Sequence, residues 1–364
     1  MQIEFDFEEE NDFRLFSLKE IKETKKSYNV LELFSGAGGM ALGLHKAGLN
    51  PVALVDIEPN ANKTILNNFP DWKVLEEDIN EIAENGIKSI LSDNEIKEID
   101  VLTGGFPCQP FSYAGKREGL EDTRGTVFYS LAKIIKELNP KLFVLENVKG
   151  LTTHDKGRTF KTVLEILEEM NYHLEYQVLN AWDHNVPQKR ERIFIVGIRN
   201  EYESNFRWPI KENYKPVLKD VLYNVPKSEG SLYPEKKKKV LELVPPGGSW
   251  VDLPDEIARE YMGRSYYSGG GRRGMARRLS YDEPSLTLTT SPAQKQTERC
   301  HPEETRPFNL REYARIQTFP DDYEFIGSIS SVYKQIGNAV PVNLSFKIGQ
   351  GIVDTLERMG KENE

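Results

Sequence analysis

The chain has 364 residues, a formal net charge of −9 and two cysteines, Cys108 and Cys300. This length is too great for one ordinary hydrophobic core and predicts a large domain with a smaller one. Two cysteines exclude a disulfide framework, and no stretch resembles a signal peptide or approaches the ~20 apolar residues of a membrane helix, so we expect a soluble, cytoplasmic protein.

The first part of the chain alternates between apolar strand patterns and helical patterns. Residues 1–28 are polar and acidic and are expected to form a loose arm or a peripheral helix. Continuous apolar segments are typical of buried parallel strands, and their alternation with helices predicts a doubly wound, mostly parallel α/β sheet over residues 29–200. The expected strands are 30–34, 51–55, 100–103, 142–145 and 193–198, and the expected helices are 40–47, 127–138 and 159–170.

The character of the sequence changes after Arg199. Residues 201–305 are rich in Pro, Gly, Tyr and Lys and have weak periodicity, so we expect a second, irregular domain of mostly short strands and loops. The stretch from Gly263 to Arg299 contains seven basic and three acidic residues. Although the protein as a whole is acidic, this region could therefore bind a polyanion. Residues 306–364 are expected to return to the first domain, with 335–343 opening a final helix.

A glycine loop, Phe34-Ser35-Gly36-Ala37-Gly38-Gly39, follows the first expected strand. Glycines let a ligand approach the backbone, and the start of the next helix offers free N–H groups to an anion. Asp56 ends the second strand about twenty residues after Gly36, where an acidic side chain meets ribose hydroxyls in dinucleotide folds. Further carboxylates on Glu32, Glu58 and Asp78 would repel a pyrophosphate and suit a nucleoside with a zwitterionic tail. The structural alternative is a plain strand–helix turn.

Three further segments combine reactive side chains with strand ends. Cys108 lies in a Gly- and Pro-stiffened loop after a strand, which suits a fixed nucleophile, although a lone cysteine is more often buried. Glu146 ends another strand; if enclosed, it should titrate upward and could donate a proton, whereas the alternative is a surface glutamate. The segment Gln188 to Arg192 carries forked guanidinium groups that suit a carbonyl oxygen or a phosphate, or are solvated charges.

The motifs described above, in this order along the chain, resemble those of the C5-cytosine-specific DNA methyltransferases of bacterial restriction–modification type. The resemblance covers the chain from Tyr28 to about Ile352 and implies a Rossmann-like methyltransferase fold. It also implies S-adenosylmethionine as cofactor, S-adenosylhomocysteine as product, no metal, and double-stranded DNA as substrate, with 201–305 as the target recognition domain. Six blocks carry it: residues 34–39, 105–112, 146–148, 188–192, 306–320 and 337–340.

The resemblance implies a role for each reactive side chain. The Cys108 thiolate would add to C6 of a flipped-out cytosine and so activate C5 for methyl transfer. Glu146 would hydrogen-bond the N3/N4 edge, Arg192 would hold O2, and Arg190 would support the pocket or the backbone. Cys300, in a polar setting, should be dispensable.

The resemblance also assigns cofactor and DNA contacts. Phe34 would face the adenine, Asp56 would bind the ribose, and Ile57 would stack more weakly than the aromatic residue of many relatives. The expected cofactor set is Phe34, Ser35, Gly36, Ala37, Gly38, Gly39, Asp56, Ile57, Asp78, Ile79, Pro107, Asn338 and Val340. The expected DNA contacts are Gln109, Ser112, Lys116, Arg124, Arg264, Arg272, Arg273, Arg277, Arg278, Thr287 and Leu288.

Other functions are open alternatives. The same motifs occur in a relative that methylates transfer RNA, but the arginine-bearing recognition region favours duplex DNA. A catalytically silent DNA-binding protein would not need Cys108, Glu146 and Arg192, and a nicotinamide oxidoreductase would need a dinucleotide fingerprint that is absent. We expect a DNA-associated monomer without membrane contact, and any cognate restriction endonuclease to act on the same site without a stable complex.

Overall fold

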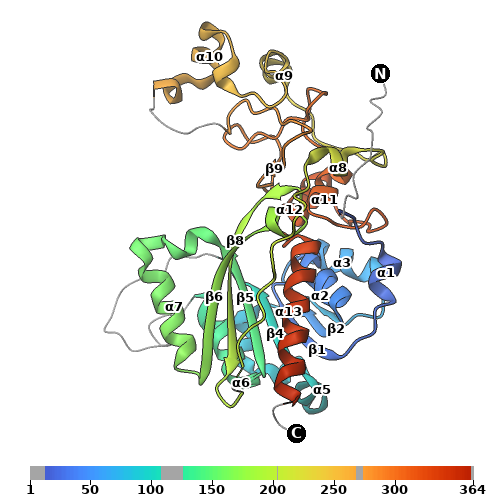
Figure 1. Ribbon diagram of the computed structural model, residues 1–364, viewed down its shortest axis with the longest axis vertical. Coiled ribbons are helices and arrows are strands. Elements are labelled where there is room, and N and C mark those ends of the chain that lie inside the picture. The colour runs from blue at the N-terminus through green and yellow to red at the C-terminus, as the bar shows by residue number, and fades with distance from the viewer. Residues whose placement is uncertain (1–12, 108–125, 203, 268–273, 362–364) are drawn as a thin grey trace.

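The protein is described by a computed structural model that covers residues 13–107, 126–202, 204–267 and 274–361. A seven-stranded sheet with the order β3-β2-β1-β4-β5-β8-β6 forms the centre of the lower lobe in Figure 1. Its strands are β1 (Tyr28–Leu33), β2 (Leu49–Val55), β3 (Val74–Leu75), β4 (Val101–Gly105), β5 (Leu142–Val148), β6 (Tyr172–Asn180) and β8 (Glu191–Arg199).

Helices cover both faces of this sheet, and the upper lobe contains short helices joined by long loops. The described α-helices are α1 (Leu18–Lys22), α2 (Gly39–Ala47), α3 (Pro59–Asn68), α4 (Ile79–Asn85), α5 (Asp93–Glu98), α6 (Val127–Leu138), α7 (Arg158–Glu168), α8 (Leu218–Leu222), α9 (Glu235–Glu242), α10 (Asp255–Met262), α11 (Leu310–Ile316), α12 (Ile329–Asn338) and α13 (Val342–Lys361). Short 3-10 turns are η1 (Ile87–Ser89), η3 (Lys149–Thr152), η4 (His154–Gly157), η5 (Ala181–His184), η6 (Trp250–Asp252) and η7 (Gly263–Tyr267).

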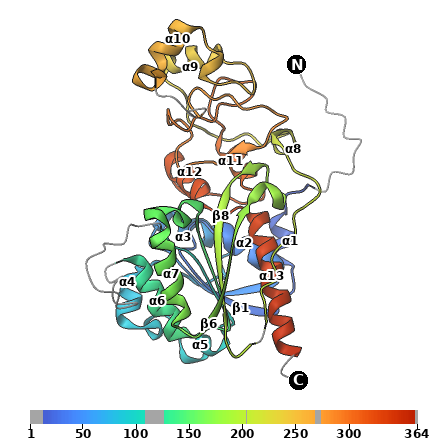
Figure 2. The ribbon, with the colours of Figure 1, turned by 60° about the vertical axis from the view of Figure 1, so that its left-hand side comes forward.

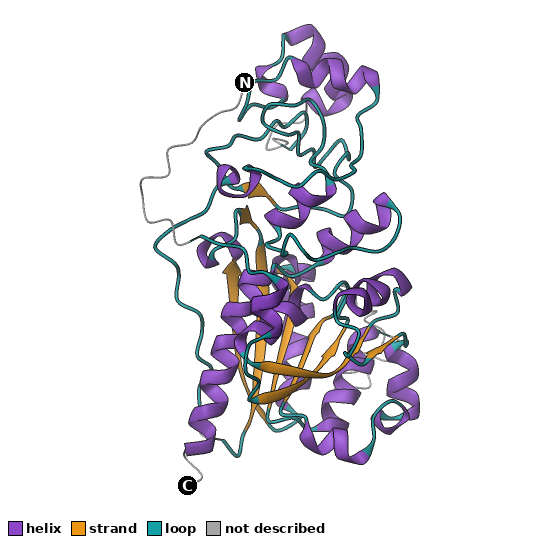
Figure 3. Ribbon diagram, turned by 90° about the vertical axis from the view of Figure 1, so that its right-hand side faces the viewer, coloured by secondary structure: helices purple, strands orange, loops and turns teal. Residues whose placement is uncertain are grey.

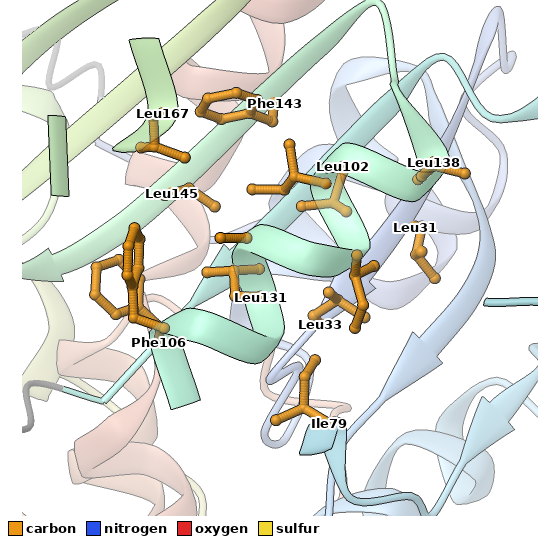
Figure 4. Close-up of a cluster of buried hydrophobic side chains, with 14 of the residues drawn as sticks. Leu31, Leu33, Ile79, Leu102, Phe106, Leu131, Leu138, Phe143, Leu145 and Leu167 are labelled. Carbon is orange, nitrogen blue, oxygen red and sulfur yellow. The ribbon is translucent and has the colours of Figure 1, made fainter. Parts of the chain in front are cut away.

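The two faces of the sheet bury separate apolar layers, because successive side chains of a strand point to opposite sides. On one face, Leu31 and Leu33 of β1 join Leu102, Phe143 and Leu145 and pack against α4, α6 and α7 (Figure 4). The opposite layer combines strand residues with α2 and α13, which lie on the other side of the sheet in Figure 2. The fold is therefore the predicted doubly wound α/β architecture.

One strand of the sheet runs against the predicted direction, and two strands, the two-residue β3 and the long β6, were not predicted. The expected strand 193–198 is part of β8, which pairs antiparallel with both β5 and β6, so its assignment as a parallel strand is wrong. β6 was not predicted because it is an edge strand in which exposed and partly buried residues outnumber the buried ones, so no continuous apolar run marks it. β8 lies between β5 and β6 and is apolar along most of its length because both faces are covered.

The upper lobe contains fewer strands than expected. Within the described part of residues 201–305, α8, α9 and α10 are joined by long loops, and β9 (Ser285–Leu286) is the one named strand (Figure 3). The expected loops are therefore present, whereas the expectation of several short strands is wrong. The lobe has its own small core around Leu241, Leu253 and Cys300. β9 pairs in parallel with β7 (Gln188–Lys189), which joins this lobe to the sheet.

The C-terminal segment contains two helices, α12 and α13, where a single helix starting within residues 335–343 was expected. Residues 335–338 close α12, and α13 starts at Val342. Val340 stands before Pro341, and a residue before proline is disfavoured in the helical conformation, so the two helices separate at this point. Near the other terminus, the short helix α1 buries Leu18 and Ile21, as expected of a peripheral helix, and residues 1–12 lie outside the described residues. None of the helices in the described ranges has the length and apolarity needed to span a bilayer.

The close packing of α2 on α13 makes a stability prediction. A Cβ added at Gly43 would lie 2.5 Å from both the Phe346 nitrogen and the Val342 carbonyl oxygen. Gly43→Ala should therefore lower the free energy of unfolding by about 1–3 kcal/mol, as measured by denaturant titration, because backbone atoms cannot yield as a flexible side chain does. Gly360→Ala, in the last turn of α13 with no atom within 4 Å, is the control and should gain up to ~1 kcal/mol. Equal stability of Gly43→Ala and the wild type would contradict the packing.

Candidate active site at the carboxyl ends of the strands

A cavity of about 440 Å³ opens where β1, β2, β4 and β5 end. Its walls come from the predicted blocks and the chain's far end: residues 34–37 and 39, 56–58, 105–107, 146–148, Arg190, Arg192 and 337–340. A smaller cavity of about 240 Å³ adjoins it, since the two share Phe34, Asp56, Ile57 and Pro107. Asp78 and Ile79 line the smaller cavity. Segments as far apart in sequence as Phe34 and Val340 thus meet at one edge of the sheet.

The conformation of the glycine loop is set by its backbone dihedral angles and by a hydrogen bond to Asp56. Phe34 (φ +58°), Gly36 (φ +51°) and Gly38 (φ +80°) adopt left-handed conformations, which turn the chain sharply from β1 into α2. The Gly36 N–H donates to the Asp56 carboxylate at 2.7 Å, and the Tyr323 hydroxyl donates to the Ala37 carbonyl at 2.8 Å. Gly39 must be small, because a Cβ there would lie 2.5 Å from the Val340 carbonyl oxygen.

Asp56 lies where the glycine loop and the start of α3 meet. One carboxylate oxygen accepts from Gly36 and the other accepts from the Glu58 N–H at 2.8 Å. Burial raises the pKa of Asp56. Beside it, Ile57 is 64% exposed and gives both cavities an apolar rim. Asp78 caps α4 by accepting from the Asn80 N–H at 2.8 Å.

Glu32 was named among the carboxylates near the glycine loop, but it was not assigned to the expected cofactor set. It is 2% exposed on β1, lines the larger cavity and has one carboxylate oxygen without a hydrogen-bond partner among the described residues. Burial and, to a smaller extent, the nearby Asp56 raise the pKa of Glu32 to about 8. A charged residue within an otherwise apolar strand, Val30-Leu31-Glu32-Leu33, is the signal that could have identified it.

Glu146 and Arg192 form an ion pair on the cavity wall. The Arg192 Nε lies 2.8 Å from Glu146 Oε1, and both side chains are about one-tenth exposed, at 12% and 11%. They meet because β8 is antiparallel to β5, which brings the first residues of β8 beside the last residues of β5. Burial raises the pKa of Glu146 although Arg192 opposes the shift, so the predicted direction of its titration is confirmed. The neighbouring Asn147 donates to the Phe106 carbonyl at 2.8 Å and fixes the end of β4.

The two cysteines differ in what the structure shows. Cys108 lies outside the described residues, as do Gln109, Ser112, Lys116, Arg124, Arg272 and Arg273. Pro107, which precedes Cys108 in sequence, lines both cavities. Cys300 is buried in the upper lobe, and burial raises its pKa to about 11, which keeps the thiol protonated and argues against a nucleophilic role.

Several predicted DNA contacts have structural partners. Arg278 is 4% exposed, and its guanidinium donates to the carbonyls of Leu241, Val244 and His301, so this side chain is not available to DNA. Its assignment as a DNA contact is therefore corrected to a structural role. Arg277 bonds the Gly248 carbonyl and pairs with Glu283.

The other described DNA candidates lie in different settings. The Thr287 hydroxyl donates to the Lys189 carbonyl, and Leu288 is buried against the sheet lobe. Arg264 is exposed on η7. Of the predicted contacts that the structure describes, Arg264 is thus the basic side chain best placed to meet a ligand from solvent.

Comparisons with known proteins agree with this geometry. A family model for the C-5 cytosine-specific DNA methylases matches residues 28–354. The chain is 54% identical to the Type II methyltransferase M.Sau96I of Staphylococcus aureus, covering 95% of this chain and 81% of that protein. It is 51% identical to the Type II methyltransferase M.Eco47II of Escherichia coli, with 97% and 89% covered.

Solved structures share the fold. A protein described as a prophage-encoded DNA modification methyltransferase of Escherichia coli matches with a TM-score of 0.67 and 24% identity, over 91% of this chain and all of that one. DNMT2 of Spodoptera frugiperda matches with a TM-score of 0.63 and 21% identity, again over 91% of this chain and 100% of its own. The arrangement of sheet and helices is thus that of a Rossmann-like methyltransferase.

Proposed function

This chain belongs to the C-5 cytosine-specific DNA methylases and is a DNA cytosine-5-methyltransferase, and from that premise we propose how its residues carry out the reaction. The Cys108 thiolate attacks C6 of a cytosine flipped out of duplex DNA, which makes C5 nucleophilic. S-adenosylmethionine supplies an electrophilic methyl group on its sulfonium. Once C5 has taken this methyl group and S-adenosylhomocysteine has formed, loss of the C5 proton to water breaks the C6–sulfur bond and returns the thiolate.

The observation that carries the proposal is the Glu146–Arg192 pair, which shares one cavity with the glycine loop and with Pro107 next to Cys108. A buried carboxyl with a raised pKa can hold a proton and donate it to N3 of the base, which makes C6 more electrophilic. Arg192 orients that carboxyl and can present its remaining N–H groups to O2. A base bound here would have its methyl donor on the adjoining glycine-loop side.

The cofactor half of the cavity fits a cationic nucleoside. Asp56 and Glu58 supply negative charge, and Glu32 adds to it once it has lost its proton; this favours a sulfonium and an ammonium and disfavours a pyrophosphate. Glu32 has one carboxylate oxygen, and Ser35 its hydroxyl, without a hydrogen-bond partner in the described part of the chain, so both offer hydrogen-bond positions. The start of α2 suits a carboxylate. We propose that Glu32 binds the amino group, Asp56 the ribose, and Ile57 with Asp78 and Ile79 the adenine.

The remaining cofactor and DNA assignments follow from the same placement. Asn338 and Val340 line the larger cavity, and the Val340 carbonyl lies beside Gly39 of the glycine loop. Arg264, Arg272 and Arg273 stay proposed DNA contacts, whereas Arg278 does not. We further propose that the enzyme works as a cytoplasmic monomer and that a restriction endonuclease of the same target acts independently. The relatives are named Type II methyltransferases, which supports a restriction–modification context for this enzyme.

The raised pKa of Glu32 predicts that cofactor binding depends on pH. Below about pH 8 the empty site holds a protonated Glu32, so binding the positively charged amino group must release that proton. S-adenosylhomocysteine should therefore bind more tightly as pH rises toward 8, with proton release detected by calorimetry in buffers of different ionisation enthalpy.

Glu32→Gln should lose both the proton release and the pH dependence. Glu58→Gln removes a carboxylate from the same cavity that pairs with Lys334 at its surface, and it should keep both. The assignment of Glu32 to the amino group would be wrong if the Glu32→Gln protein released protons as the wild type does.

Tritiated S-adenosylmethionine offered with duplex DNA, with transfer RNA or with neither tests the function. Label should enter duplex DNA, and bisulfite sequencing of DNA from expressing cells should then locate the methylated site. Transfer to RNA alone would favour the alternative substrate, and no transfer to either would favour a silent DNA-binding protein.

A further inference from the structure

Arg190 is a buried cation whose hydrogen bonds go to main-chain carbonyls. Its residue is 1% exposed, and burial, with a smaller contribution from Arg192, lowers the pKa of its guanidinium to about 9. The Nη2 group donates to the carbonyls of Gly337 at 3.1 Å and Ala339 at 3.0 Å, and the Nη1 group donates to the Leu288 carbonyl at 3.3 Å. These acceptors belong to two segments about fifty residues apart in sequence, which one side chain joins.

The first segment is the part of the recognition lobe around Leu288. Its main chain is held on both sides, because the Leu288 N–H donates to Gln188 Oε1 at 2.9 Å while its carbonyl accepts from Arg190. Gln188 and Arg190 are two residues apart on an extended stretch and therefore face the same side. Gln188 also donates to Gln317, which in turn donates to the Ala339 carbonyl at 3.0 Å. Two parallel routes thus connect Leu288 with residue 339.

The second segment is the wall of the cofactor cavity. Gly337 to Val340 line that cavity, and Arg190 lies at the C-terminal end of α12, where helix carbonyls carry partial negative charge. The recognition lobe touches this wall directly, because a Cβ on Gly337 would lie 2.6 Å from the Thr289 carbonyl carbon and 2.9 Å from the Thr290 nitrogen. On its far side, the wall approaches Gly39 of the glycine loop.

We infer that Arg190 is a positioning residue that makes the binding of DNA and of S-adenosylmethionine interdependent. Its guanidinium makes all of its hydrogen bonds only when the recognition lobe and the cofactor wall are both in place. A ligand that orders one segment therefore lowers the cost of ordering the other, and the two ligands strengthen each other's binding. This inference rests on the proposed function and deepens it, since it concerns the link between the two binding sites.

The test measures this coupling with S-adenosylhomocysteine and a duplex that carries the methylation site. In the wild type, saturating duplex should tighten binding of S-adenosylhomocysteine roughly five- to one-hundredfold, and S-adenosylhomocysteine should tighten duplex binding by the same factor. Arg190→Lys keeps the charge but loses the planar, forked guanidinium, so the coupling factor should fall severalfold below that of the wild type, while the route through Gln188 and Gln317 retains the remainder.

Arg199→Lys is the matched control. Arg199 lies at the other end of β8, where it bonds the Asn139 carbonyl and pairs with Glu201, away from both segments. This variant should keep the wild-type coupling. A merely structural role of Arg190 would weaken each ligand separately and lower the melting temperature without changing the coupling factor.

Gly337→Ala gives a second, independent perturbation, because its methyl group must push the wall away from Thr289 without altering any charge. Gly337→Ala should also lower the coupling factor. If Arg190→Lys does not fold, the coupling measured in Gly337→Ala tests the inference on its own. Wild-type coupling in both folded variants, or no coupling in the wild type, would overturn the inference. A wild type that methylates duplex DNA without such coupling would leave the proposed function intact, whereas no methylation would refute that function itself.

Discussion

Replacing Cys108 with serine is expected to abolish methyl transfer while the binding of S-adenosylhomocysteine and duplex DNA stays unchanged. A hydroxyl of high pKa cannot supply the nucleophile that a thiolate supplies, and the proposed contacts to both ligands do not involve the sulfur. Transfer of tritium from S-adenosylmethionine to DNA measures the loss, and binding titrations measure the retained affinities. A Cys108→Ser protein that methylates DNA at a comparable rate would exclude the covalent mechanism.

The same mechanism predicts a trapped complex. Duplex DNA with 5-fluorocytosine at the target should form an adduct with the wild-type enzyme that resists denaturation in the presence of S-adenosylmethionine. Fluorine at C5 cannot leave as a proton does, so release of the enzyme stalls after methylation. Peptide mapping should place the adduct on Cys108, because Cys300 is buried with its pKa raised to about 11. An adduct on Cys300 would contradict the assignment of the nucleophile.

Glu146→Gln is expected to lower the rate of methyl transfer by about 10²- to 10⁴-fold, the usual contribution of a positioned proton donor. The amide keeps an oxygen for Arg192 but has no proton of suitable acidity for N3. Single-turnover rates with saturating DNA and cofactor measure this effect, and thermal unfolding shows whether the variant stays folded.

The pH dependence separates proton donation from a structural role of Glu146. Burial raises its pKa, so the protonated fraction, and with it the rate, should fall as pH increases through that raised pKa. The variant should lose this alkaline limb. Glu191→Gln, which changes an exposed carboxylate paired with Lys149 beside Arg192, is the control and should keep it. An unchanged profile in Glu146→Gln would exclude Glu146 as the donor.

The sequence by itself determined most of the α/β core and the cofactor side of the site. Strands β1, β2, β4 and β5 and helices α2, α6 and α7 could be predicted because buried strands are continuously apolar and amphipathic helices have a clear period. The glycine loop and Asp56 could be predicted for the same local reason, since a turn and a strand end are defined by neighbouring residues. The resemblance of six motifs then supplied the reaction.

Only the tertiary structure decided which charged side chains are buried and which are accessible to a ligand. Arg278 and Arg264 look alike in sequence, yet one is buried among carbonyls and the other is exposed, because burial depends on segments far along the chain. Glu32 stands near the glycine loop in the sequence, but its place in the wall of the cavity depends on where β1 ends in the fold. The direction of β8 had the largest consequence. Strand pairing is set by non-local contacts, and a parallel β8 would have carried Arg192 to the opposite edge of the sheet, whereas the antiparallel strand brings it to Glu146.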